Sequence, residues 1–295
     1  MISGVQITVT GIMTKIGIFL EMIKFTHTIF ALPFALTGAL MAANGLPSVR
    51  QIAWIILAMV GARTAAMAMN RLIDADIDAR NPRTAVRAIP AGLIGKGLTF
   101  IFIVLSTALM LFSAYMLNPL CLKLSPIALF FLLLYSYCKR FTSLAHVVLG
   151  ICLAAAPIGA WVAIRGAIDA PALVLGSVVL FWVAGFDILY ALQDLDFDRD
   201  AGLHSIPVLL GVNGSLWAAR LFHLIMIVLL FVLLILLNLG AIFLVGILTT
   251  ILMLAYEHWL LRDGDLTKLD AAFFNMNGYI SVAIVFFTAA ELLTR

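Results

Sequence analysis

The sequence contains very little charge. Only 11% of its 295 residues are Asp, Glu, Lys or Arg, whereas 64% belong to the hydrophobic set. A soluble domain of average composition is about half apolar and roughly a quarter charged. A chain of this length with so few charges cannot cover a water-exposed surface, so the composition predicts an integral membrane protein. It excludes a disordered chain, and a net charge of only +3 excludes a nucleic-acid-binding protein.

Cysteine is also scarce. The three cysteines, Cys121, Cys138 and Cys152, lie in or beside apolar stretches and form no CxxC pair. This pattern excludes a disulfide scaffold and indicates that the cysteines act as small hydrophobic residues. The N-terminus lacks the basic stretch and small-residue cleavage site of a signal peptide, so we expect the first apolar stretch to remain as a membrane span.

Long apolar stretches dominate the sequence instead. A membrane-spanning helix needs about 20 mostly apolar residues, and barrel strands would be shorter and alternating. Nine stretches meet the helical requirement, at 18–43, 51–69, 97–117, 125–138, 144–164, 172–192, 215–237, 240–259 and 272–292. The sequence therefore predicts an all-α polytopic membrane bundle of nine transmembrane helices, with residues 1–295 forming one domain.

The few charges are unevenly distributed between the two ends of this bundle. Thirteen of the 18 Lys and Arg residues fall on one side and four on the other, while Arg63 lies inside the second span. The positive-inside rule then predicts a cytoplasmic N-terminus and an external C-terminus. The rule does not concern acids, yet 13 of the 15 Asp and Glu residues lie on the same inner side. The concentration of acidic residues on this side therefore needs a separate explanation.

Two acidic clusters account for much of this excess. Asn70, Asp74 and Asp78 follow the second span at i, i+4 and i+8, so a continuing helix places them on one face. Asp194 and Asp198 follow the sixth span with the same spacing, and a shift of 120 residues superposes the two clusters. This register predicts an internal repeat of parallel orientation, with motifs at 70–78 and 194–198.

The residue types in these clusters are typical of a metal site. Oxygen ligands in this number suit Mg²⁺, which prefers one or two carboxylates together with substrate phosphate. Arg83, Arg87, Lys139 and Arg140 are basic residues on the same side. A single pair of Asp residues four apart is usually solvated surface, but two copies in register favour a functional site. The pattern predicts a magnesium and diphosphate site that faces the cytoplasm.

The two clusters resemble the aspartate-rich motifs of the UbiA family of intramembrane aromatic prenyltransferases. The stretches 83–92, 135–142, 187–194 and 202–207 agree with this resemblance, and 24–33 with 203–207 are most similar to the 4-hydroxybenzoate polyprenyltransferase-like branch. The resemblance implies nine helices around a central cavity with a cytoplasmic cap, in the inner (plasma) membrane. It also implies Mg²⁺-dependent transfer of a polyprenyl group from polyprenyl diphosphate. The acceptor would be a ring carbon of 4-hydroxybenzoate or a hydroxynaphthoate, in ubiquinone or menaquinone biosynthesis.

The resemblance also suggests roles for individual residues. The metal ligands would be Asn70, Asp74, Asp78, Asp194 and Asp198, and the diphosphate ligands Arg83, Lys139 and Arg140. Either Asp194 or Asp187 would activate the hydroxyl of the acceptor, and the sequence does not decide between them. Further substrate contacts are expected from Lys24, Arg63, Arg87, Tyr190 and His204.

Arg63 has two alternative roles, and Arg71 differs from the pattern of the family. Arg63 is either a structural partner of Asp187 or another acid, or it reaches the diphosphate or the carboxylate of the acceptor. Arg71 stands where many members of the family carry Asp, and we expect its side chain to point away from the face of the metal ligands.

A secondary transporter of a phosphorylated or Mg²⁺-bound solute is the main alternative function. Internal repeats and carboxylates near helix ends fit a transporter as well. Transporter sites usually lie near the middle of the membrane, whereas both acidic clusters lie at one face. The sequence therefore favours the enzyme.

Overall fold

The computed structural model describes residues 15, 17–22, 32–262 and 276–295, and within these ranges every regular element is helical. The long helices, in chain order, are α2 (Leu32–Ala43), α3 (Val49–Ile73), α5 (Lys96–Leu117), α6 (Pro119–Cys138), α7 (Ala145–Arg165), α8 (Ala170–Ala191), α10 (Ile206–Leu236), α11 (Ala241–Leu260) and α12 (Asn277–Thr294). Three short elements lie between them, namely α4 (Ala75–Asp78), η2 (Leu192–Asp194) and α9 (Leu195–Asp200). The predicted all-α bundle is confirmed.

Eight of these helices are long and apolar enough to cross a membrane, and α2 is a shorter apolar helix. The sequence predicts nine spans, and the described residues contain eight spans and the shorter α2. Part of the first predicted span lies outside the described residues. Large apolar side chains such as Leu252 and Phe286 are exposed on the outer faces of the bundle. An aqueous protein rarely exposes such surface, so these faces indicate contact with lipid.

Two helices begin earlier than their hydropathy predicts, because polar residues cap them. Asn118 precedes Pro119 and accepts a 2.9 Å hydrogen bond from the amide of Cys121, which starts α6. Ser205 accepts a 3.2 Å bond from the amide of Val208 and starts α10 in the same way. Within α10, Gly211 adopts a φ of 67°, which produces a kink that glycine allows without strain.

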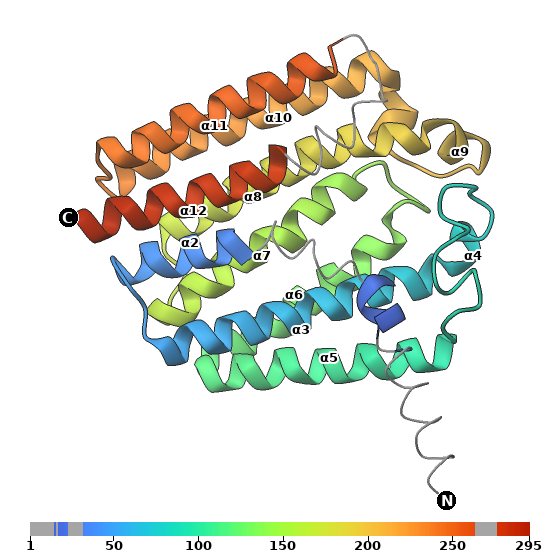
Figure 1. Ribbon diagram of the computed structural model, residues 1–295, viewed down its shortest axis with the longest axis horizontal. Helices are drawn as coiled ribbons and strands as arrows, with labels where there is room; N and C mark the ends of the chain where they lie inside the picture. The colour runs from blue at the N-terminus through green and yellow to red at the C-terminus, as the bar shows by residue number, and fades with distance from the viewer. Residues whose placement is uncertain (1–14, 16, 23–31, 263–275) are drawn as a thin grey trace, which may run out of the picture.

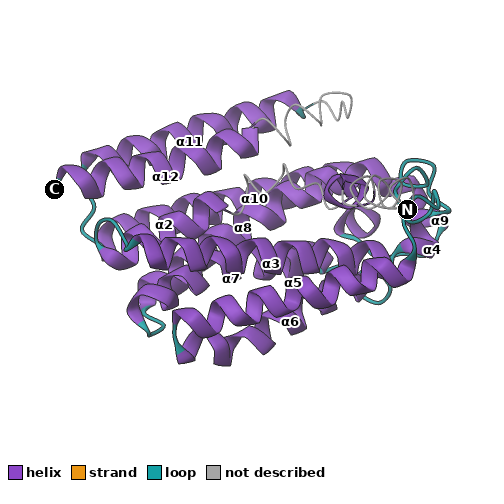
Figure 2. Cartoon of the chain, turned by 60° about the horizontal axis from the view of Figure 1, so that its bottom comes forward, coloured by secondary structure: helices purple, strands orange, loops and turns teal. Residues whose placement is uncertain are grey.

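Helix α8 lies at the centre of the bundle, packed between α7 and α10 (Figures 1 and 2). Its buried side chains, including Trp182, form the main hydrophobic cluster with α2, α10, α11 and α12. Small residues allow close helix contact, since a Cβ at Gly150 of α7 would lie 2.5 Å from the carbonyl oxygen of Leu180 in α8. This packing holds α8 rigidly, and α8 carries the second aspartate motif at its end.

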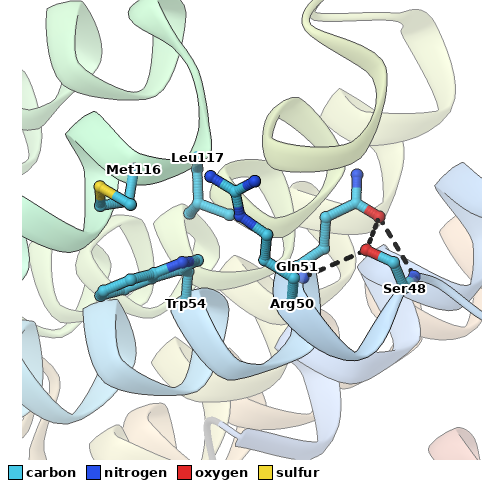
Figure 3. Close-up of a pocket in the computed structure, with 6 residues that line it drawn as sticks. All are labelled: Ser48, Arg50, Gln51, Trp54, Met116 and Leu117. Carbon is cyan, nitrogen blue, oxygen red and sulfur yellow. Dashed lines mark hydrogen bonds between the residues drawn. The ribbon is translucent and has the colours of Figure 1, made fainter.

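The aspartate motifs and a pocket lie at opposite ends of the bundle. Helices α4 and α9 lie side by side at one end, opposite the C-terminus, as Figure 1 shows. A pocket at the far end is formed by the start of α3 and the end of α5, and Figure 3 shows its lining residues, Ser48, Arg50, Gln51, Trp54, Met116 and Leu117. Because α3 contains 25 residues, its two ends are about 36 Å apart. This pocket is therefore remote from the aspartate motifs.

Candidate active site

The two aspartate motifs have nearly the same backbone geometry. Asp74 ends α3 with φ −90° and ψ 3°, and Asp194 precedes α9 with φ −103° and ψ 6°. The sequence predicts a continuing helix through the first motif, and this is wrong at Asp74, where the helix is interrupted. The amide of Asp78 nevertheless donates to the carbonyl of Asp74 at 2.7 Å, so the helical spacing of the carboxylates survives.

Asn70 and Asp74 are in direct contact. The side-chain amide of Asn70 donates a 2.8 Å hydrogen bond to Oδ2 of Asp74, as expected for residues on one helical face. Arg71 is buried, and its Nη1 lies 3.5 Å from Oδ1 of Asn70. The expectation that Arg71 points away from this face is therefore wrong, because its long side chain bends back toward its neighbour.

The end of α6 connects the two motifs. Nη2 of Arg140 lies 2.9 Å from Oδ1 of Asp74, and Nζ of Lys139 lies 3.3 Å from Oδ2 of Asp198. Adjacent basic residues thus contact carboxylates that are more than 120 positions apart in the sequence. The backbone contributes as well, since the amide of His204 donates to the carbonyl of Lys139 at 2.8 Å.

The loop after the first motif reaches the second one. Arg83 donates from Nε to Oδ1 of Asp194 at 2.9 Å and from Nη2 to Oδ2 of the same carboxylate. Asn81 donates a further 3.0 Å bond to Oδ1 of Asp194, and Nη1 of Arg83 donates to the hydroxyl of Tyr190 at 3.4 Å. Both oxygens of Asp194 are therefore occupied.

A fourth ion pair completes the cluster. Nη1 of Arg87 lies 2.6 Å from Oδ1 of Asp78, while Oδ2 of Asp78 is buried and has no hydrogen-bond partner. By contrast, the side chains of Asp76 and Asp196, which belong to the same acidic stretches, are 90% and 92% exposed. The fold therefore divides these acids into four that pair with bases inside the cluster and two that face solvent.

Burial and neighbouring charges act in opposite directions on this cluster. Burial raises the pKa of Asp74, and the nearby carboxylate of Asp78 raises it further, against the lowering effect of Arg140. Burial lowers the pKa of Arg83, but its hydrogen bonds and charge interaction with Asp194 outweigh this and raise the pKa overall. Each of the four carboxylates is paired with one Arg or Lys side chain.

The donor set fits a hard divalent cation. Four carboxylates supply oxygen ligands of the kind that Mg²⁺ prefers, and the unpartnered Oδ2 of Asp78 is free to bind one. In the described part of the chain, however, no three His, Cys, Asp or Glu side chains are already arranged around one point. The carboxylates are engaged with Arg and Lys, so metal binding requires exchange of these partners.

The remaining predicted residues lie in varied positions. Asp187 accepts a 2.7 Å hydrogen bond from Nδ1 of His146. Within the described residues Arg63 has no ion pair, and its Nε is buried without a hydrogen-bond partner, so Asp187 is not its partner. The side chain of His204 is exposed. Lys24 lies outside the described residues.

Two residues at the site, Asn81 and His146, were not identified from the sequence. Asn81 lies three residues after Asp78 and directly before Pro82. A polar residue at such a turn is common in ordinary loops, so its position does not indicate a site residue. His146 has no spacing pattern with other histidines, and only the packing of α7 against α8 brings it to Asp187. Contacts between residues so distant in sequence leave no local signal.

The fold and this cluster together define an integral membrane protein with a charged site at one end of its helical bundle. Residues 31–279 match the model of the UbiA prenyltransferase family. The chain belongs to the UbiA prenyltransferase family, and the enzyme class predicted from the sequence is confirmed.

Similar proteins support this assignment over almost the whole chain. A protein of Vibrio cholerae named 4-hydroxybenzoate octaprenyltransferase is 31% identical over 263 residues, which are 88% of this chain and 89% of that protein. A protein of the same name from Francisella tularensis is 27% identical, with the same shares of both chains.

Solved structures agree. The apo structure of a UbiA homologue from Aeropyrum pernix K1 has a TM-score of 0.83 and 34% identity, and the match covers 90% of this chain and 98% of that one. A UbiA homologue from Archaeoglobus fulgidus, bound to DMAPP and Mg²⁺, has a TM-score of 0.65, 20% identity, and coverage of 92% and 99%. At that identity the second comparison supports the fold alone.

Proposed function

We propose that this enzyme transfers a polyprenyl group from polyprenyl diphosphate to a ring carbon of a hydroxylated aromatic acid, in a Mg²⁺-dependent reaction. The acceptor is 4-hydroxybenzoate or a hydroxynaphthoate, and the product enters ubiquinone or menaquinone biosynthesis. The observation that carries this proposal is the alternation of four carboxylates with four bases, contributed by three separate segments at one end of the bundle.

This alternation matches the charge pattern of a metal diphosphate. Asp74, Asp78, Asp194 and Asp198 would hold the metal, directly or through water, with Asn70 as a neutral ligand. Arg83, Lys139, Arg140 and Arg87 would bind the diphosphate oxygens. Arg offers two parallel hydrogen bonds to such oxygens and Lys a compact charge.

The chemistry needs this concentration of positive charge. Transfer breaks the C1–O bond of the allylic diphosphate, and the electron pair remains on the leaving diphosphate. The metal supplies electrostatic stabilisation of that charge, and the released bases of the chain add to it. The allylic carbon then bonds to the aromatic ring, which loses one proton to restore its aromaticity. The hydroxyl of Tyr190 accepts a hydrogen bond from Arg83, and we expect it to contact the substrate.

Arg63 fits the carboxylate of the acceptor. It lies seven residues before Asn70 on α3, roughly two helical turns deeper in the membrane. A cation within a span almost always has a partner, and Arg63 has no carboxylate partner in the described part of the chain. An aromatic acid that enters with its carboxylate toward Arg63 would present its ring to the allylic carbon. The names of the Vibrio and Francisella relatives agree with such an acceptor.

We further propose that the enzyme is one domain with a parallel internal repeat in the inner (plasma) membrane. Its N-terminus and the site face the cytoplasm, and its C-terminus lies outside. The matching backbone of Asp74 and Asp194 supports the repeat. The basic residues at the end with α4 and α9 support the orientation under the positive-inside rule.

Purified protein in lipid nanodiscs provides the test. With Mg²⁺ and radiolabelled polyprenyl diphosphate, addition of 4-hydroxybenzoate or 1,4-dihydroxy-2-naphthoate should yield a labelled lipid product that contains the aromatic ring. Asp194→Ala should abolish the product, whereas Asp196→Ala, which alters an exposed neighbour, should not. If no aromatic acid in a panel of hydroxybenzoates and hydroxynaphthoates is prenylated, the proposed acceptor class is wrong.

A further inference from the structure

A buried His–Asp pair lies beside the diphosphate site. His146, in the first turn of α7, is 1% exposed, and its Nδ1 lies 2.7 Å from Oδ2 of Asp187 in α8. A carboxylate oxygen only accepts hydrogen bonds, so Nδ1 of His146 carries the proton and donates it. The orientation of both side chains is thereby determined, because the pair is held between two helices that pack closely.

The two carboxylates that could activate the acceptor differ in their free oxygens. Asp194 uses both of its oxygens for Arg83 and Asn81. Asp187 uses only Oδ2, for His146, and among the described residues no hydrogen bond reaches its Oδ1. The side chain of Asp187 is 17% exposed, although the histidine that holds it is buried. Asp187 therefore has an available oxygen in a determined orientation, and Asp194 does not.

The position of the His146–Asp187 pair also suits a base that acts on the acceptor. Asp187 lies seven residues before Asp194 on α8, about two turns deeper in the bundle. Tyr135 of α6 lies within electrostatic reach of both Asp187 and Asp74, and His146 lies within reach of Asp198. The pair thus lies between the diphosphate site and the apolar interior of the bundle.

We propose that Asp187 is the base that accepts the hydroxyl proton of the aromatic acceptor, and that His146 is the positioning residue that holds it. This inference rests on the proposed function. The proton moves from the hydroxyl to Oδ1 of Asp187, and the resulting phenolate attacks the allylic carbon as the C1–O bond of the donor breaks. The ring proton then leaves to solvent or diphosphate, and Asp187 returns its proton to the oxygen. The sum is one prenylated phenol, one diphosphate and one released proton.

His146 contributes through the carboxylate rather than through substrate contact. Without its Nδ1–H, Asp187 would lose the charge-assisted bond that directs Oδ1 toward the acceptor. His146→Asn keeps a donor near the position of Nδ1, whereas His146→Ala removes it. Glu257→Gln is a matched control for Asp187→Asn, because Glu257 is a buried carboxylic acid in α11 whose Oε2 has no hydrogen-bond partner.

The test compares two acceptors, 4-hydroxybenzoate and 2,6-difluoro-4-hydroxybenzoate. The fluorines make the hydroxyl more acidic and leave both carbons beside it free. With 4-hydroxybenzoate, Asp187→Asn and His146→Ala should each lower kcat about 100-fold, the lower range for loss of general-base catalysis. The KM for polyprenyl diphosphate should stay within about twofold, since the base does not contact the diphosphate. His146→Asn should recover at least a tenth of the wild-type kcat, and Glu257→Gln should match the wild type.

The difluoro acceptor distinguishes a catalytic base from a residue that only maintains the structure. Its more acidic hydroxyl ionises more readily without a base, so the losses in Asp187→Asn and His146→Ala should shrink to about 10-fold or less. Equal losses with both acceptors, or a raised KM for the donor, would refute the inference and indicate a structural pair. Normal activity of His146→Ala would refute it as well. If the wild type prenylates only 1,4-dihydroxy-2-naphthoate, the same variants are compared with that acceptor, and wild-type kcat in Asp187→Asn would refute the inference. If the wild type prenylates neither the benzoates nor the naphthoate, the proposed function fails instead, and the inference falls with it.

Discussion

The contact between Arg83 and Asp194 offers the sharpest test of how the site is assembled. Arg83 donates two parallel hydrogen bonds to Asp194, whose side chain is 11% exposed, while its own is 34% exposed. Arg83→Ala would leave a mostly buried carboxylate with only the bond from Asn81. Loss of one partner from a fully buried pair costs about 3–5 kcal/mol and from an exposed pair about 0–1 kcal/mol. The partial exposure of Arg83 places the expected loss of unfolding free energy at about 2 kcal/mol.

A second substitution separates stability from donor binding. In Arg83→Ala with Asp194→Asn, no unpaired charge remains and Asn81 still has an acceptor, so the unfolding free energy should return to within about 1 kcal/mol of the wild type. Activity should not return, because the proposed diphosphate ligand Arg83 and the proposed metal ligand Asp194 are both missing. Arg83→Lys should keep most of the stability and bind the donor more weakly, since Lys cannot form two parallel bonds.

Equilibrium unfolding of the purified protein in mixed micelles, followed by tryptophan fluorescence, measures the first effect. Titration with a non-hydrolysable polyprenyl diphosphonate in the presence of Mg²⁺ measures the second. An Arg83→Ala variant as stable as the wild type would show that Asp194 does not depend on this contact. A double variant as unstable as Arg83→Ala would refute the argument that the unpaired carboxylate causes the loss.

Three further predictions concern the same cluster. Asp78→Asn should lower prenyl transfer at least about 100-fold in a product assay, whereas Asp76→Asn should retain near-normal turnover, because only Asp78 is buried with an open oxygen. Equal loss of activity in both variants would contradict the division between the acids inside the cluster and the exposed acids. Lys139→Ala should raise the KM for the donor more than the KM for the acceptor, as steady-state kinetics with each substrate varied would measure; an effect confined to the acceptor would remove Lys139 from the diphosphate. Treatment with EDTA should abolish the transfer and added Mg²⁺ should restore it, and full activity of the metal-free protein would exclude the metal.

Much of the fold could be predicted from hydropathy. The ends of α5, α7, α8 and α11 lie within two residues of the apolar stretches that predict them. Hydropathy is reliable here because the membrane requires every spanning backbone to bond within itself. The starts of α6 and α10 could not be predicted in this way, because Asn118 and Ser205 determine them through local capping bonds.

The candidate site was predictable in its composition but not in its pairing. The spacing of Asn70, Asp74 and Asp78 indicates a common helical face, and the repeat directs attention to Asp194. The ion pair between Arg83 and Asp194 forms because the loop that carries Arg83 folds back against the end of α8. No sequence pattern predicts where that loop lies. The same holds for Arg71, whose side chain bends toward Asn70 against the expectation from helical geometry.

Composition, periodicity and motif spacing are enough to place this protein in a membrane, to locate most of its spans and to predict the end that carries the site. This is possible because apolar length, charge and helical periodicity are local properties of the chain. The packed helices, in contrast, are needed to show which base contacts which carboxylate, which acids face solvent, and that His146 contacts Asp187. These contacts join residues that are distant in sequence, and they depend on the packing of α8 between its neighbours.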